Sequence, residues 1–115
     1  SALALVRTLQ ASFPPGRRLL IFAGSSDKDL AGMFRVLSPY FAHAFLTRYT
    51  NNPRSVAAER LAELLRTNGN IPPTLCPTPA DALHSAHAAA SPDDLIVITG
   101  SVFLAGELRP LLIAG

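Results

Sequence analysis

The sequence has few of the residues that build disulfide-linked or metal-held scaffolds. Cys76 is its one cysteine, so a disulfide within the chain and a cysteine metal cluster are both excluded. It lies near prolines without an evident base, so we expect a buried, inert thiol. His84 and His87 share one face of a predicted helix, but no further ligand lies nearby in the sequence, so we predict no metal site. A single cysteine also fits a reducing compartment, and we expect a cytoplasmic protein.

Charge of one sign and long apolar runs are also scarce. Charged residues make up 16% of the 115 residues, and the formal net charge is +2. Apart from the pair Arg17-Arg18 the basic residues are scattered, so we predict no nucleic-acid partner. The apolar segments are interrupted every few residues, so we predict no transmembrane helix and no membrane partner. Apolar residues still reach 49%, which is enough for the core of one domain over residues 1–115.

Several familiar active-site motifs are missing. The sequence contains no Gly-x-x-x-x-Gly-Lys-Ser/Thr, so it has no P-loop for the phosphates of ATP. It contains neither the Gly-x-Gly-x-x-Gly of dinucleotide-binding domains nor the Gly-x-Ser-x-Gly of hydrolases. Asp93-Asp94 precede a predicted strand, whereas a receiver domain needs its acidic pair after one. We therefore assign no catalytic residue to this chain.

Predicted strands and helices alternate along the chain. Continuous apolar runs, typical of strands buried on both faces of a parallel sheet, predict strands over 18–23, 43–47 and 95–99, with a weaker one at 74–76. Helical periodicity and breaker residues predict helices over 2–13, 29–37, 56–65, 79–90 and 102–113, with Thr78 as an N-cap. This alternation predicts an α/β sandwich with a mostly parallel sheet.

Three polar loops follow predicted strands, at 24–29, 48–54 and 100–101. In open parallel sheets, ligands bind beyond the carboxyl ends of the strands. Together the loops carry two carboxylates, three cations, hydroxyls and helix N-terminal amides, which suit an anionic or zwitterionic substrate. Arg48 and Arg54 also fit as solvated loop arginines, and the third loop fits an ordinary turn.

The first of these loops has a plain structural interpretation as well. Ser26 or Asp27 fits the N-cap of the following helix, and Asp29 is favourable near its positive end. Lys28 is different, because it is the only lysine and a cation in a first helical turn opposes the helix dipole. A bound carboxylate or phosphate would explain its position.

Taken in order, three stretches resemble the C-terminal domain of bacterial folylpolyglutamate synthase/dihydrofolate synthase, a branch of the Mur ligase family. Residues 20–29 are similar to the strand, short loop and Asp-Lys-Asp of that family. Residues 46–48 with 52–54 resemble its Thr-Arg and Asn-Pro-Arg loop, and residues 93–107 resemble its closing strand, Gly-Ser and final helix. The resemblance covers nearly the whole chain.

The resemblance implies a Rossmann-like three-layer sandwich and a place in an ATP-dependent ligase. Such enzymes activate a carboxylate as an acyl phosphate, which the amine of glutamate then attacks to extend a folate, or which yields dihydrofolate from dihydropteroate. A central domain carries the P-loop, the magnesium ligands and most of the ATP site. The C-terminal domain closes over it and contributes contacts to ATP and the amino acid.

The same resemblance implies roles for individual residues. Lys28 is the candidate for the glutamate carboxylate, Ser101 would assist there, and the weaker substrate-binding candidates are Asp27, Arg48 and Arg54. The family also has Asp-Gly-Ala-His-Asn-Pro just before the helix at 2–13, and this sequence lacks it. Because that motif carries ATP-facing groups, we expect a fragment that is inactive alone.

Two alternatives remain open from the sequence. The chain also fits another Mur-type ligase, acting on peptidoglycan precursors or in cyanophycin synthesis, because the substrate pocket of these enzymes lies largely in other domains. It also fits a free-standing α/β module that binds a nucleotide or a protein. An upstream P-loop and Asp-Gly-Ala-His-Asn-Pro would eliminate the free-standing module.

Overall fold

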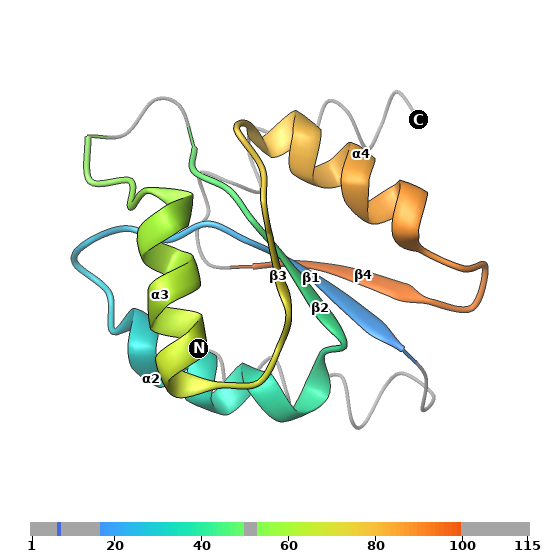
Figure 1. The fold of residues 1–115 in the computed structure, drawn as a ribbon, viewed down its shortest axis with the longest axis horizontal. Coiled ribbons are helices and arrows are strands. Elements are labelled where there is room, and N and C mark those ends of the chain that lie inside the picture. The colour runs from blue at the N-terminus through green and yellow to red at the C-terminus, as the bar shows by residue number, and fades with distance from the viewer. Residues whose placement is uncertain (1–6, 8–16, 50–52, 100–115) are drawn as a thin grey trace.

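A sheet of four strands forms the centre of the computed structural model, which describes residues 7, 17–49 and 53–99 (Figure 1). The strands pair in parallel in the order β3-β2-β1-β4, and they are β1 (Arg18–Phe22), β2 (His43–Leu46), β3 (Pro73–Leu75) and β4 (Leu95–Thr99). The described helices are α2 (Leu30–Leu37), the short 3-10 helix η1 (Ser38–Tyr40), α3 (Ala58–Asn68) and α4 (Pro79–Ala89). The predicted α/β class with a parallel sheet is therefore confirmed.

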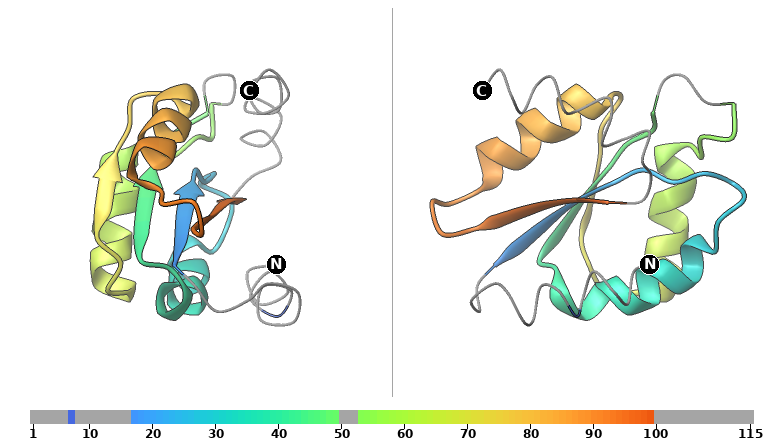
Figure 2. Two further views of the ribbon diagram at one scale, coloured as in Figure 1. Left: turned by 90° about the vertical axis from the view of Figure 1, so that its right-hand side faces the viewer. Right: turned by 180° about the vertical axis from the view of Figure 1, so that it is seen from behind.

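The strand β1 explains why the fold has three layers. Its successive side chains point to opposite faces of the sheet. Leu20 and Phe22 pack in the core beneath α2 and α3, whereas Leu19 and Ile21 pack in the core beneath α4. All four are buried, and each contributes about 1.5–3 kcal/mol relative to an exposed position. Figures 1 and 2 show α2 and α3 on one side of the sheet and α4 on the other.

The order of the strands reverses direction beside β1. The chain steps from β1 to β2 and then to β3, and α4 carries it back across the sheet to β4 on the other side of β1. The carboxyl ends of β1 and β4 therefore flank a topological switch point, where ligands bind in open α/β sheets. The loops that follow these two strands are 24–29, which is described, and 100–101, which lies outside the described residues.

Element ends differ from the predictions for physical reasons. α3 was expected over 56–65 but covers Ala58–Asn68. It starts late because the Val56 amide donates to the Gly24 carbonyl at 2.9 Å, which ties Val56 to the loop after β1. β3 begins at Pro73, one residue before the expected 74–76. It is an edge strand in the described sheet, where proline is tolerated.

Other predictions hold in the described part of the chain. α4 begins as expected, with the Thr78 hydroxyl accepting from the Asp81 amide at 3.1 Å and Pro79 in the first turn. The helix expected over 102–113 lies outside the described residues, and so does the helix expected over 2–13 apart from residue 7. None of the described helices has the length and apolar character needed to cross a membrane.

Candidate functional site

The loops that follow β1 and β2 are joined through their backbones. The Ser26 amide donates to the Arg54 carbonyl at 2.8 Å, and the Val56 amide donates to the Gly24 carbonyl at 2.9 Å. Between these bonds lies an isolated antiparallel bridge. The two loops therefore form one backbone unit at the carboxyl edge of the sheet, and a side chain from either loop has a defined position relative to the other.

The start of α2 corrects the prediction for the first loop. Asp29 is the N-cap, and its carboxylate accepts from the Gly32 amide at 3.1 Å; neither Ser26 nor Asp27 has that role. Lys28 therefore precedes the cap and lies outside the first helical turn in which it was expected. Its charge still lies near the positive end of α2, but it is free to point away from the helix axis.

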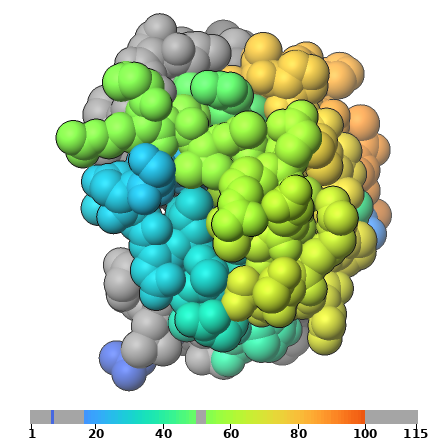
Figure 3. Space-filling view, turned by 60° about the vertical axis from the view of Figure 1, so that its left-hand side comes forward, coloured from blue at the N-terminus to red at the C-terminus, as the bar shows by residue number. Residues whose placement is uncertain are grey.

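Lys28 lines a cavity of about 400 Å³ between its loop and α3. Its side chain is exposed, and it makes no hydrogen bond or ion pair with another residue that the structure describes. The cavity is lined by Ser26, Lys28, Asp29, Leu30, Ala31, Val56, Arg60 and Leu64. Figure 3 faces this side of the molecule, where the loop after β1 meets α2 and α3. The cavity thus combines an apolar wall with two cations.

Asp27 uses both of its carboxylate oxygens within the site. The Ser25 hydroxyl donates to Oδ1, and Nη1 of Arg54 lies 3.7 Å from Oδ2. The hydrogen bond from Ser25 is the main reason that the pKa of Asp27 lies below its usual value, with smaller contributions from Lys28 and Arg54. Asp27 is therefore a carboxylate that faces a cation of the neighbouring loop.

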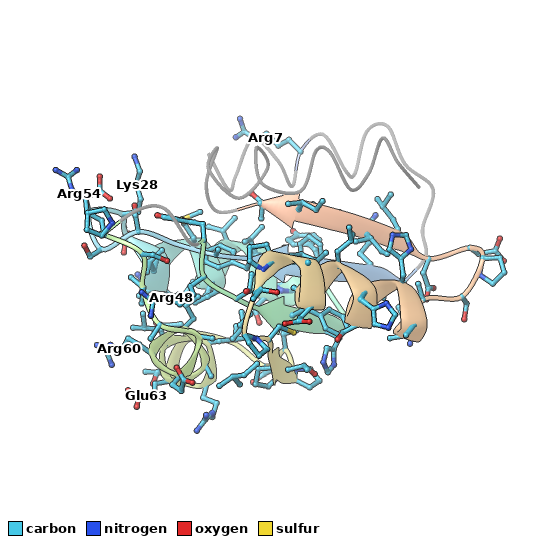
Figure 4. All side chains as sticks on the ribbon, turned by 90° about the horizontal axis from the view of Figure 1, so that it is seen from above. Arg7, Lys28, Arg48, Arg54, Arg60 and Glu63 are labelled. Atoms are coloured by element: carbon cyan, nitrogen blue, oxygen red, sulfur yellow. The ribbon has the colours of Figure 1, made fainter. Side chains whose placement is uncertain are left out.

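Arg48 belongs to a second cavity, of about 320 Å³, at the carboxyl ends of β2 and β3. Its lining residues are Arg48, Ala58, Glu59, Leu75, Cys76 and Pro77. Figure 4 shows Lys28, Arg48, Arg54 and Arg60 on the same side of the molecule, with Lys28 and Arg54 at one corner. The structure thus brings Asp27, Lys28 and Arg54 together and places Arg48 in a different hollow. Ser101 lies outside the described residues.

Sequence reasoning missed two features of this edge. Arg60 lines the cavity of Lys28 and pairs with Glu63 at 3.0 Å. The only sign of it in the sequence is a cation near the start of the predicted helix over 56–65. Tyr49 was assigned to a polar loop, but it is buried in the core beneath α4. One aromatic residue in a polar stretch is the signal that indicates such an anchor.

Neither the histidines nor the cysteine forms a site in the described part of the chain. His84 and His87 are exposed on α4. Cys76 is buried, and burial raises the pKa of its thiol, as expected for an inert group. Within residues 17–49 and 53–99 no three His, Cys, Asp or Glu side chains gather to hold a metal ion.

Comparison with known proteins identifies the relatives of this domain. Residues 1–102 match the family model described as "Mur ligase, glutamate ligase domain". A UDP-N-acetylmuramyl-tripeptide synthetase of Lactobacillus acidophilus is 30% identical over 106 residues, which are 87% of this chain and 20% of that protein.

Two solved structures share the fold closely. Folylpolyglutamate synthase of Mycobacterium tuberculosis, complexed with ADP and AMPPCP, is 32% identical with a TM-score of 0.85, over 96% of this chain and 26% of that one. FolC of E. coli, in complex with DHPP and ADP, is 25% identical with a TM-score of 0.87, over 98% of this chain and 26% of that one. The chain spans about a quarter of the length of these structures. From the family match over most of its length, the chain belongs to the Mur ligase family, as a glutamate ligase domain.

Proposed function

We propose that this domain serves an ATP-dependent ligase that adds glutamate to folate, and that it binds the incoming glutamate. Membership of the Mur ligase family supports the reaction class. The likeness to folylpolyglutamate synthases at 32% and 25% identity supports folate as the acceptor. We also propose that the complete enzyme binds ATP, folate and glutamate and that it acts in the cytoplasm.

The position of Lys28 is the observation that carries the proposal. An ammonium group without a hydrogen bond or ion pair to any described residue stands beyond the carboxyl end of β1, beside the switch point of the sheet. The N-cap at Asp29 and the bonds between the two loops hold the backbone around it. Such a cation binds a carboxylate by a charge-assisted hydrogen bond, and glutamate supplies carboxylates.

The domain's contribution to the reaction is orientation. In the proposed ligase the folate carboxylate takes the terminal phosphoryl group of ATP, which leaves ADP and an acyl phosphate. The glutamate nitrogen then attacks the carbonyl carbon, and the amide forms as phosphate leaves and the nitrogen loses a proton. Lys28, assisted by Arg54, holds the glutamate carboxylates so that the amine faces that carbon, and Ser101 orients the amino acid from the loop after β4. Holding the two reactants in this geometry replaces an encounter in solution.

We assign ATP and magnesium to other parts of the complete enzyme. The sequence has no P-loop to hold the phosphates of ATP, with which a bound magnesium ion shares its ligands.

Substitution of Lys28 in the full-length ligase tests the proposal. Lys28→Ala removes the charge-assisted contact, and we expect kcat/KM for glutamate to fall about tenfold to a hundredfold. The matched control is Arg66→Ala, which removes an exposed cation near the far end of α3. A Lys28→Ala enzyme with unchanged kcat and unchanged KM for glutamate would remove Lys28 from the site.

A second candidate function follows from the curated relative. The 30% identity to a UDP-N-acetylmuramyl-tripeptide synthetase favours a ligase that extends a peptidoglycan precursor. The full-length enzyme decides between the two: we expect ATP-dependent ligation with folate and glutamate, and none with a UDP-N-acetylmuramyl peptide acceptor. The reverse result would establish the second candidate.

A further inference from the structure

We infer that Asp27 is a positioning residue, which orients the guanidinium of Arg54 beside Lys28 and does not itself touch the amino-acid substrate. The inference rests on the proposed function. Lys28 and Arg54, which lie at one corner of the molecule (Figure 4), are the cations that bind the substrate in this inference. The carboxylate of Asp27, with Oδ2 at 3.7 Å from Nη1 of Arg54, holds that guanidinium in place.

Both oxygens of the Asp27 carboxylate already face groups of the protein itself. Oδ1 accepts the hydroxyl of Ser25, and Oδ2 faces Nη1 of Arg54 at 3.7 Å. A substrate ammonium group at either oxygen would share that oxygen with one of these partners. The carboxylate of Asp27 is therefore directed toward its own protein.

The backbone hydrogen bond between the two loops indicates that Asp27 orients a side chain and is not needed to join the loops. The Ser26 amide already ties the carbonyl of Arg54 to the first loop at 2.8 Å, so the two loops stay joined without the Asp27 carboxylate. What Asp27 adds is the direction of the Arg54 side chain. Loss of the carboxylate should then leave thermal stability unchanged and affect only the binding of the anion that Arg54 contacts.

The exposure of the pair sets the size of the effect. The side chains of Arg54 and Asp27 are 68% and 47% exposed. An ion pair this exposed is weak, so we expect Asp27→Asn to raise KM for glutamate about threefold. Arg54→Ala removes the substrate contact itself and should raise that KM about tenfold or more.

A double-mutant cycle in the full-length ligase tests the inference. The variants are Asp27→Asn, Arg54→Ala and the double variant, with glutamate KM, kcat and Tm measured for each. Asp93→Asn is the matched control, because Asp93 is an exposed aspartate before β4, at the opposite end of the sheet. We expect Asp27→Asn to raise KM without changing kcat or Tm, and to have no effect once Arg54 is alanine.

Three results would overturn the inference. They are an unchanged KM in Asp27→Asn, the same rise in KM with and without Arg54, and an unchanged KM in Arg54→Ala. If Lys28→Ala still raises KM in those cases, only the positioning role is lost. If Lys28→Ala and Arg54→Ala both leave KM unchanged, the proposed function fails and the inference fails with it.

Discussion

Lys28 and the two histidines of α4 show how position decides what a polar side chain does. Lys28 lies beyond the carboxyl end of a central strand and lines a cavity. His84 and His87 are exposed on a helix that covers one face of the sheet, away from the strand ends. Each of these residues is a polar group that can bind a ligand, but only Lys28 lies where an open parallel sheet binds one.

Ser101 provides the test of this distinction. It follows β4, the strand on the other side of the switch point, and in the proposed site it orients the amino acid. We expect Ser101→Ala in the full-length ligase to lower kcat/KM by on the order of tenfold to a hundredfold, because a misplaced nucleophile reacts slowly. The double variant His84→Ala/His87→Ala should stay within about twofold of the parent, as surface substitutions do. Normal activity in the serine variant, with loss in the histidine variant, would place the active face elsewhere.

At the scale of elements, the amino end of the sheet is closed by an ion pair between β1 and β4. Nε and Nη2 of Arg17, just before β1, donate to Oδ2 of Asp94, just before β4, at 2.9 and 2.5 Å. Nη2 also donates to the Ala89 carbonyl at the end of α4, and the Ser91 amide donates to Asp94. The pair thus joins two strands and a helix at the end of the sheet opposite to the candidate site.

This ion pair predicts a pH dependence of stability. The hydrogen bond from Arg17 is the main cause that lowers the pKa of Asp94 in the folded chain. A carboxylate with a lowered pKa stabilises the fold above its ordinary pKa, and the contribution is lost as pH falls below about 4. Asp94→Asn should therefore lower the Tm of the 115-residue chain at neutral pH, and the difference from the parent should shrink in acid. Its neighbour Asp93 is exposed, so Asp93→Asn should change little; equal effects would contradict the role of the ion pair.

At the scale of the whole molecule, the chain corresponds to one part of much longer ligases. It has a core on each face of its sheet, and it spans about a quarter of the folylpolyglutamate synthases that it resembles. The proposed role of the candidate site is to bind the carboxylates of glutamate, and the sequence has no P-loop to position the phosphates of ATP.

We therefore expect no ATP hydrolysis and no ligation by the 115-residue chain alone. Phosphoryl transfer depends on groups that position the phosphates and the metal ion, and the sequence lacks the P-loop that cradles the phosphates. Phosphate release is measured with ATP, folate and glutamate against a heat-inactivated sample. Release above that control would show that the domain carries catalytic groups of its own.

The amino-acid sequence alone determined the elements and the edge of the sheet where polar loops gather. β1 and β4 each carry four consecutive apolar residues, and those of β1 are buried because helices cover both faces of the sheet there; the helices repeat their apolar residues on one side. Tertiary structure decided which polar groups meet. Arg54 lies beside Asp27 and Arg48 does not, because the bonds between two loops depend on the order of the strands. The local periodicity of apolar residues indicates which side of an element is buried. Contacts between distant loops depend instead on how the strands pair. The partners of Asp27 and the late start of α3 could therefore be known only from the fold.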